Sequence, residues 1–157
     1  MLKNLIASNS LSLDLHPFGT DKGTIHSYIE ELYIPIFDSG ENFGVIYEIG
    51  VWHGASLVAW KLLFPHARVV AYDIEKRELH PVALRLLENQ QITINYDDAY
   101  SDSVIGLVKE KIDLLIDDGP HTIKSQIDSL KWLDKLSEKG TLVIEDIVGG
   151  IVGIRKI

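Results

Sequence analysis

Two short acidic segments of the chain carry residue types that can bind a metal ion or accept a proton. One reads IDDGPHT over residues 116–122, and the other reads VIED over residues 143–146. Carboxylate oxygens are hard ligands that suit Mg²⁺, Mn²⁺ or Ca²⁺, and a neutral imidazole beside them can take a proton. For the first segment alone a plain turn is an equal alternative, because Asp, Gly and Pro form turns for purely local reasons.

An alternation of strands and helices would position both segments. Apolar, β-branched runs of strand length occur at residues 44–50, 67–74, 92–97, 112–118 and 141–147. Helical spacing of apolar residues occurs between them, at residues 54–64, 79–89, 101–111 and 123–140, the last ending at Lys139 and Gly140. The alternation predicts an α/β fold, a doubly wound, mainly parallel, Rossmann-like sheet with helices on both faces.

Carboxylates recur at the carboxyl ends of all five predicted strands. They are Glu48, Asp73, Asp97, Asp98, Asp117, Asp118, Glu145 and Asp146. In a doubly wound sheet, ligands bind beyond the carboxyl ends of the strands, near the point where the strand order reverses. We therefore expect the functional site at this edge of the sheet.

The turn after the first strand favours one cofactor over others. A dinucleotide fingerprint needs a second glycine where this chain has Trp52, so NAD and FAD are disfavoured. Asp73 follows Gly50 by 73 − 50 = 23 residues, close to the spacing of an acid that binds ribose hydroxyls. A ribose without a pyrophosphate indicates S-adenosylmethionine, although a solvated loop acid remains the alternative for Asp73.

A set of ten residues is predicted to bind this cofactor. Glu48 is expected near its aminoacyl end, and Asp98 near the adenine amino group. The predicted cofactor-binding residues are Glu48, Gly50, Trp52, Gly54, Ser56, Asp73, Ile74, Asp97, Asp98 and Asp117.

These segments together resemble a known family. The stretches YEIGVWHGASLVAW, AYDI, IDDGPHT and GTLVIEDI are similar to those of class I S-adenosylmethionine-dependent methyltransferases, and FGTDKGTIHSY resembles a segment that precedes the fold. The narrower resemblance, over about residues 18–147, is to the metal-dependent macrolide sugar O-methyltransferases and the cephalosporin hydroxylase-like group. Pro120 departs from the pattern, since the family usually has Ser there.

The resemblance implies roles for the two acidic segments. It implies that Asp118, Glu145 and Asp146 hold Mg²⁺, and that His121 is the general base, with Asp118 and His121 as the catalytic residues. It also implies two further strands after the fifth. Residues 147–157 can supply one short strand at most, so we expect the C-terminal strands to be missing or shortened and the fifth strand to have an exposed edge that favours self-association.

Two parts of the chain are expected. Residues 1–40 form an N-terminal helical or lid segment, with a short helix over residues 24–37. Lys22, His26 and Tyr28 form a lid over the cofactor or belong to a packing helix, and both alternatives stay open. Residues 41–157 form the S-adenosylmethionine-binding Rossmann-like domain.

Composition limits the partners. The net charge is −8 and the pI is near 5.1, so nucleic acid is disfavoured and a small-molecule acceptor is favoured. There is no cysteine, which excludes thiolate chemistry, and no apolar run long enough to span a membrane. A cytoplasmic location is the default expectation.

The predicted function is S-adenosylmethionine-dependent, Mg²⁺-dependent O-methylation of a small hydroxylated molecule, either a sugar or a compound resembling a natural product. Two alternatives stay open. One is a truncated, non-catalytic S-adenosylmethionine-binding module, and the other is a metal-dependent enzyme of the same group that catalyses a different reaction.

Overall fold

Six strands form one sheet in the order β3-β2-β1-β4-β5-β6, within the part of the chain that the computed structural model describes, residues 22, 28, 32–38, 42–147 and 150–155. The strands from β1 to β5 are parallel, and β6 is antiparallel to β5. The strand order reverses between β1 and β4, so the switch point lies where these two strands end. The strands are β1 Val45–Ile49, β2 Arg68–Asp73, β3 Ile92–Tyr96, β4 Ile112–Asp117, β5 Leu136–Ile147 and β6 Gly150–Arg155.

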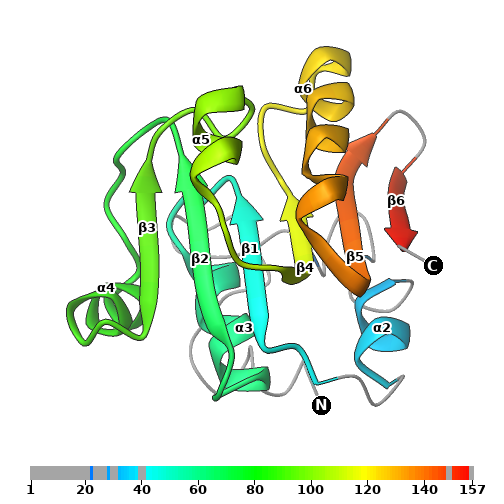
Figure 1. The fold of residues 1–157 in the computed structure, drawn as a ribbon. Coiled ribbons are helices and arrows are strands. Elements are labelled where there is room, and N and C mark those ends of the chain that lie inside the picture. The colour runs from blue at the N-terminus through cyan, green and yellow to red at the C-terminus, as the bar shows by residue number, and fades with distance from the viewer. Residues whose placement is uncertain (1–21, 23–27, 29–31, 39–41, 148–149, 156–157) are drawn as a thin grey trace.

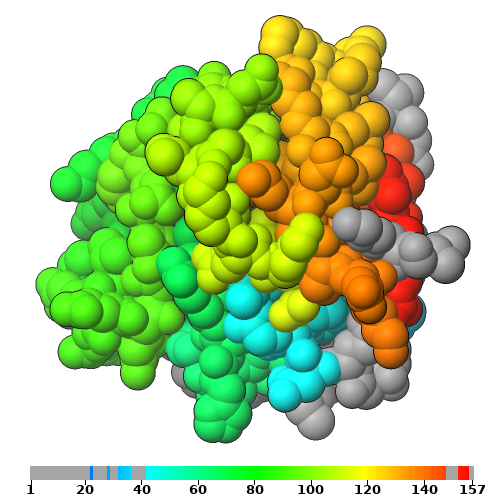
Figure 2. Space-filling view, viewed as in Figure 1, coloured from blue at the N-terminus to red at the C-terminus, as the bar shows by residue number. Residues whose placement is uncertain are grey.

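Helices lie on both faces of this sheet, as predicted (Figure 1). The segments that contain α5, α6 and η3 cover the upper and central part of the near face in Figure 2, while α3 lies behind the strands in Figure 1. The described helices are α2 Ile34–Asp38, α3 Ala55–Leu63, α4 Pro81–Glu88, α5 Asp102–Leu107, α6 Ile123–Asp128 and the 3₁₀ helix η3 Ser129–Lys135.

Each face of the sheet has its own apolar cluster, because successive strand residues point to opposite faces. Ile46 and Leu114 belong to the cluster that contains Trp60 of α3. Their neighbours Tyr47 and Leu115 belong to the cluster that contains Trp132 of η3. Both faces of the central strands are therefore dry, which explains why β1, β2 and β4 read as nearly continuous apolar runs.

The helix starts follow local capping chemistry. His80 accepts a hydrogen bond from the Val82 amide at the start of α4, with a proline in the first turn. Ser101 caps α5, and Thr122 forms a capping box with Ser125 at the start of α6. These caps fix the starts of the three helices.

The predicted helix over residues 123–140 is wrong in its second half. The helix α6 ends at Asp128, η3 follows, and β5 already begins at Leu136, which pairs with Ile112. The register then shifts before β5 resumes pairing at Thr141. A Cβ at Gly140 would lie 2.6 Å from the Ile112 carbonyl oxygen, so this glycine allows a close backbone approach inside an irregular strand and does not end a helix.

The C-terminal residues form the single short strand that was expected, but the expected exposed edge of strand five is wrong. The strand β6 pairs with β5 from Thr141↔Arg155 to Ile147↔Gly150 and covers that edge. The exposed strand edge therefore no longer supports self-association, which stays a prediction.

The predicted N-terminal helix lies mostly outside the described residues. Within residues 24–37 the structure describes Tyr28, which is helical, and residues 32–37, the last four of which belong to α2. No helix in the described ranges combines the length and the apolar character needed to cross a membrane.

A close backbone contact joins the ends of the two central strands. Gly50, which follows β1, has a φ of 89°, and its amide donates to the Tyr72 carbonyl at 2.9 Å. The Asp118 amide donates to the Ile49 carbonyl at 2.8 Å. A Cβ at Gly50 would lie 2.0 Å from the Asp118 carbonyl oxygen, so only glycine fits here.

We expect Gly50→Ala to lower the free energy of unfolding by about 3 kcal/mol or more, because the added methyl group overlaps backbone and the φ value is left-handed. Gly106→Ala is the matched control: it lies within α5 with open space around its Cβ position, and should be neutral or stabilising by up to about 1 kcal/mol. Denaturant unfolding of both variants measures this. Equal stability of the two would contradict the contact described.

Candidate functional site

A cavity of about 730 Å³ opens over the carboxyl ends of the strands from β1 to β4. This volume suits a ligand of cofactor size. Its walls come from the turns that follow those four strands. The lining residues include Gly50, Trp52, Ser56, Asp73, Ile74, Asp97, Asp98, Asp118 and His121.

Asp73 at the end of β2 holds the turn after β1. Its Oδ2 accepts hydrogen bonds from the amides of Val51 at 2.8 Å and Trp52 at 3.2 Å, and its Oδ1 accepts from the Glu75 amide at 2.8 Å. An ionised carboxylate has about four acceptor sites. Asp73 therefore fixes the cavity wall and keeps capacity for a ligand hydroxyl.

The outer wall of the cavity is aromatic and apolar. Trp52 has a φ of 48° and a side chain that is 57% exposed, and the Arg77 guanidinium lies 4.4 Å from its ring centroid. Ile74 is 78% exposed in the same lining. Apolar surface beside carboxylates suits a flat ring that carries hydroxyl groups.

The buried side chain of Asp117 stabilises the Asp-Asp-Gly turn, residues 117–119, at the end of β4. This buried carboxylate accepts hydrogen bonds from the Tyr100 hydroxyl at 2.6 Å, from the Ser129 hydroxyl and from the Gly119 amide at 3.1 Å. Burial raises the pKa of Asp117 above its usual value, while these donors oppose the rise. A Cβ at Gly119 would lie 2.2 Å from the Tyr100 hydroxyl, so the turn is tightly packed.

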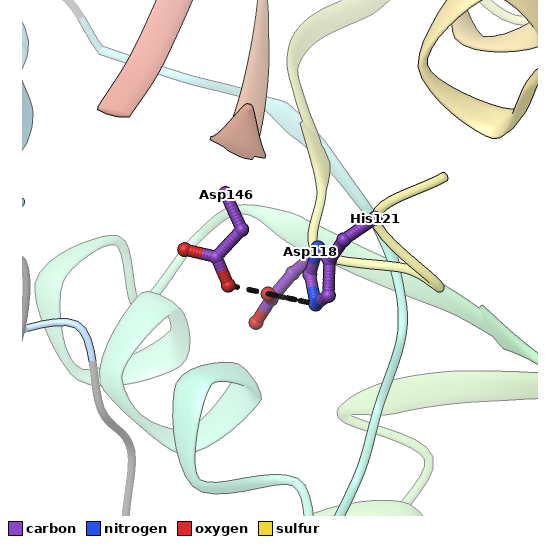
Figure 3. Close-up of side chains that lie close together, drawn as sticks. All are labelled: Asp118, His121 and Asp146. Carbon is purple, nitrogen blue, oxygen red and sulfur yellow. Dashed lines mark ion pairs between the residues drawn. The ribbon is translucent and has the colours of Figure 1, made fainter. Parts of the chain in front are cut away.

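Asp118, His121 and Asp146 converge beside this turn (Figure 3). One ligand atom from each lies within 4.8 Å of the others, with His121 Nε2 at 3.5 Å from Asp146 Oδ2 and 3.9 Å from Asp118 Oδ1. His121 and Asp146 have φ values of 55° and 53°. Such left-handed residues gather at functional sites, where the surrounding structure holds them in place.

Three residues of the N-terminal part contact the acids of this site. The Lys22 ammonium lies 2.7 Å from Asp118 Oδ2 and 2.7 Å from Glu145 Oε2. The Tyr28 hydroxyl donates to Asp146 Oδ1 at 2.7 Å, and the Tyr33 hydroxyl donates to Glu145 Oε1. Lys22 and Tyr28 are not among the residues that line the cavity, and a lid role for the N-terminal segment stays a prediction.

Burial and neighbouring charges shift the pKa values of Glu48, Glu145 and Lys22. Glu48 is fully buried on β1 and accepts from Trp60 Nε1 at 2.9 Å, and its burial raises its pKa from 4.5 to about 7. Burial likewise raises the pKa of Glu145. Burial alone would lower the pKa of Lys22, but the carboxylates of Asp118, Glu145 and Glu48 together raise it well above 10.5. Lys22 is therefore a permanent buried cation.

The structure separates the predicted residues into two groups. Seven of the ten predicted cofactor-binding residues line the cavity: Gly50, Trp52, Ser56, Asp73, Ile74, Asp97 and Asp98. The other three do not line it. Glu48 is buried against Trp60 of α3, Gly54 packs against α4, and Asp117 is buried and accepts from Tyr100. Of the predicted metal ligands, Asp118 and Asp146 converge with His121, whereas Glu145 lies against Lys22 and Tyr33. Their roles stay predictions.

Sequence reasoning missed three residues that shape the site, namely Tyr33, Tyr100 and Arg77. Tyr100 directly follows the acids after β3, so its position could have indicated a partner for Asp117. Tyr33 and Arg77 had no comparable signal, because their contacts join segments far apart in the chain.

The raised pKa of Glu48 predicts a pH-dependent effect of Glu48→Gln. Between pH 4.5 and 7 the unfolded chain ionises Glu48 while the folded chain keeps it protonated, so this residue lowers wild-type stability as pH rises through that window. Glutamine has no such cost. The stability of Glu48→Gln relative to wild type should therefore increase by about 3 kcal/mol from pH 4.5 to 7 and then level off.

Denaturant unfolding at several pH values checks this, with the exposed Glu138→Gln as the baseline for losing one surface glutamate. A stability difference between the two proteins that does not change with pH would contradict the raised pKa of the buried Glu48.

Comparison with solved structures supports the fold. MycE methyltransferase from the mycinamycin biosynthetic pathway, in complex with Mg, SAH and mycinamycin VI, superposes with a TM-score of 0.70 at 21% identity, over 92% of this chain and 36% of that one. A structure named cmcI-D160 Mg-SAM gives a TM-score of 0.58 at 23% identity, over 74% of this chain and 52% of that one. The StiE O-MT, residues 961–1257, gives 0.57 at 18%, over 83% and 47%. This chain spans about a third of the length of MycE.

No curated protein sequence matches the chain at a significant level. A family model does match: the one described as a methyltransferase domain covers residues 47–147, from β1 to the end of β5. This range contains both acidic segments and the whole cavity lining. It confirms the resemblance to class I methyltransferases drawn from the sequence, and the chain belongs to the methyltransferase-domain family.

Proposed function

We propose that this chain is an S-adenosylmethionine-dependent, Mg²⁺-dependent O-methyltransferase that acts on a small hydroxylated molecule, a sugar or a compound resembling a natural product. One observation carries the proposal. We call the cluster of Asp118, His121 and Asp146 the acid-histidine group. Two of its members, Asp118 and His121, also line the cavity, together with Gly50 and Asp73. A methyl donor in the cavity and an acceptor at the acid-histidine group would therefore share one opening.

The cavity residues suit the adenosine part of S-adenosylmethionine. Asp73 has remaining acceptor capacity for ribose hydroxyls, and the exposed Ile74 offers an apolar surface for a purine ring. Asp98 lines the same cavity, where it would accept from an adenine amino group. The structures named MycE and cmcI-D160 were solved with SAH or SAM and with Mg, which supports the same pair of ligands here.

The acid-histidine group suits a divalent cation. Asp118 and Asp146 offer two carboxylates, and their ligand atoms and that of His121 lie within 4.8 Å of one another. Carboxylate oxygens, without a thiolate, fit Mg²⁺ or Mn²⁺, and His121 lies beside them as a base. When bound, such an ion would lower the pKa of an acceptor hydroxyl beside it.

His121 is placed to receive the proton of the acceptor. Its ring lines the cavity, and Asp146 Oδ2 at 3.5 Å would stabilise the imidazolium that forms. In the reaction, the acceptor oxygen forms a bond to the methyl carbon and the carbon–sulfur bond breaks. The products are the methyl ether and S-adenosylhomocysteine, and the hydroxyl proton passes to His121. The rest of the site contributes by aligning the two substrates.

Cofactor binding is the first test. We expect calorimetry to detect S-adenosylmethionine binding to the wild type, and Asp73→Ala to weaken it about tenfold or more, because the variant loses both the ribose acceptor and the support of the turn. Asp113→Ala is the matched control, since Asp113 Oδ2 also accepts from two backbone amides, those of Gly44 and Val45, at the opposite edge of the sheet. A wild type that fails to bind the cofactor would remove the proposal.

Turnover separates an enzyme from a non-catalytic binding module. Release of S-adenosylhomocysteine is measured with a panel of sugars and catechols, with Mg²⁺ and with EDTA. We expect activity to require the metal, and His121→Ala to keep cofactor affinity while lowering kcat by about 10²-fold or more. Cofactor binding without turnover on any acceptor would favour the binding module, and full activity in EDTA would show that the metal role is misassigned.

A further inference from the structure

A buried ammonium lies between carboxylates from three strands of the sheet. Lys22 Nζ is 2.7 Å from Asp118 Oδ2 after β4, 2.7 Å from Glu145 Oε2 on β5 and 3.9 Å from Glu48 Oε1 on β1. The side chains of Lys22, Glu48 and Glu145 are 3%, 0% and 1% exposed. This is the kind of oxygen-rich arrangement that a divalent cation occupies in other proteins.

The contacts divide the oxygens of the acids into two sets. Asp118 and Asp146 each give one oxygen to the N-terminal part, to Lys22 and Tyr28 respectively, and turn the other toward His121. Glu145 gives both of its oxygens to that part, one to Lys22 and one to Tyr33. Glu145 therefore has no oxygen directed at the acid-histidine group.

We propose that Lys22 is a tethered cation that fills the Glu48-Asp118-Glu145 cluster, so that it positions Asp118 and keeps Glu145 out of the ligand set of the metal. The inference rests on the proposed function, since it concerns which residues hold the proposed metal ion. It assigns Lys22 a positioning role, and it removes Glu145 from the predicted ligand set, so that Asp118 and Asp146 hold the metal with His121 beside them as the base.

Removal of the ammonium should open this cluster to a second cation. Without Lys22, the carboxylates of Asp118 and Glu145 would face each other in a buried place with no opposite charge, which is costly. Glu48 Oε1 is the buried side-chain oxygen that finds no hydrogen-bond partner within the described residues, so it can serve as a further ligand. A divalent ion would restore the balance of charge.

Mn²⁺ binding tests the inference without any activity measurement. Calorimetry and electron paramagnetic resonance give stoichiometry and affinity for the wild type, Glu145→Gln, Lys22→Met and the double variant Lys22→Met/Glu145→Gln. Lys131→Met is the matched control, because Lys131 also bridges two carboxylates, Asp102 and Asp128, but at the surface.

The wild type and Glu145→Gln should each bind one Mn²⁺ with affinities within about threefold. Lys22→Met should bind a second equivalent, or bind Mn²⁺ about tenfold more tightly, since a positive charge a few ångströms away has been removed and a carboxylate has been freed. The double variant should lose this gain, and Lys131→Met should match the wild type.

Two results would overturn the inference: loss of Mn²⁺ binding in Glu145→Gln, or unchanged stoichiometry and affinity in Lys22→Met. If Lys22→Met is too unstable to titrate, thermal unfolding decides. Mn²⁺ should then raise its Tm more than that of the wild type, and an equal rise in both would overturn the inference. A wild type without Mn²⁺ affinity, beside a Lys22→Met variant that binds it, would support the tethered cation and remove the metal from the proposed function.

Discussion

The contact between the turn after β1 and the turn after β4 is the constraint on which the site depends. Gly50 approaches the Asp118 carbonyl so closely that no side chain fits, and the Asp118 amide bonds to the Ile49 carbonyl. These two turns lie at the switch point of the sheet, where the helices leave toward opposite faces. The contact therefore places the cavity next to the acid-histidine group, and every functional proposal made above follows from that adjacency.

Charge is the second constraint. Parallel strands bring their carboxyl ends, and here their acids, to one edge. The structure balances these acids in different ways: Asp73 and Asp117 accept hydrogen bonds from backbone amides and hydroxyls, Glu48 is held by burial and Trp60, and Glu145 pairs with Lys22. Asp118 and Asp146 keep one oxygen each directed at His121. Their other oxygens accept from the N-terminal part, Asp118 from Lys22 and Asp146 from Tyr28.

Much of the fold could be predicted from sequence because its signals are local. The alternation of apolar runs predicted the parallel sheet and most helix starts. The helix that was extended to Gly140 failed because Leu136 pairs with Ile112, a contact between distant segments that overrides helical spacing. The site followed the same rule. The acids were found from their places after strands, whereas the engagement of Glu145 by Lys22 and Tyr33 depends on a long-range contact that no spacing indicates.

The central claim is that one opening serves both a cofactor and a metal ion. Anomalous diffraction from crystals grown with Mn²⁺ and S-adenosylhomocysteine tests it most directly. The account predicts an Mn²⁺ peak at Asp118 and Asp146, beside His121, with the nucleoside in the cavity against Asp73 and Ile74. An Mn²⁺ peak bound by Glu145, or a nucleoside bound outside this cavity, would contradict it.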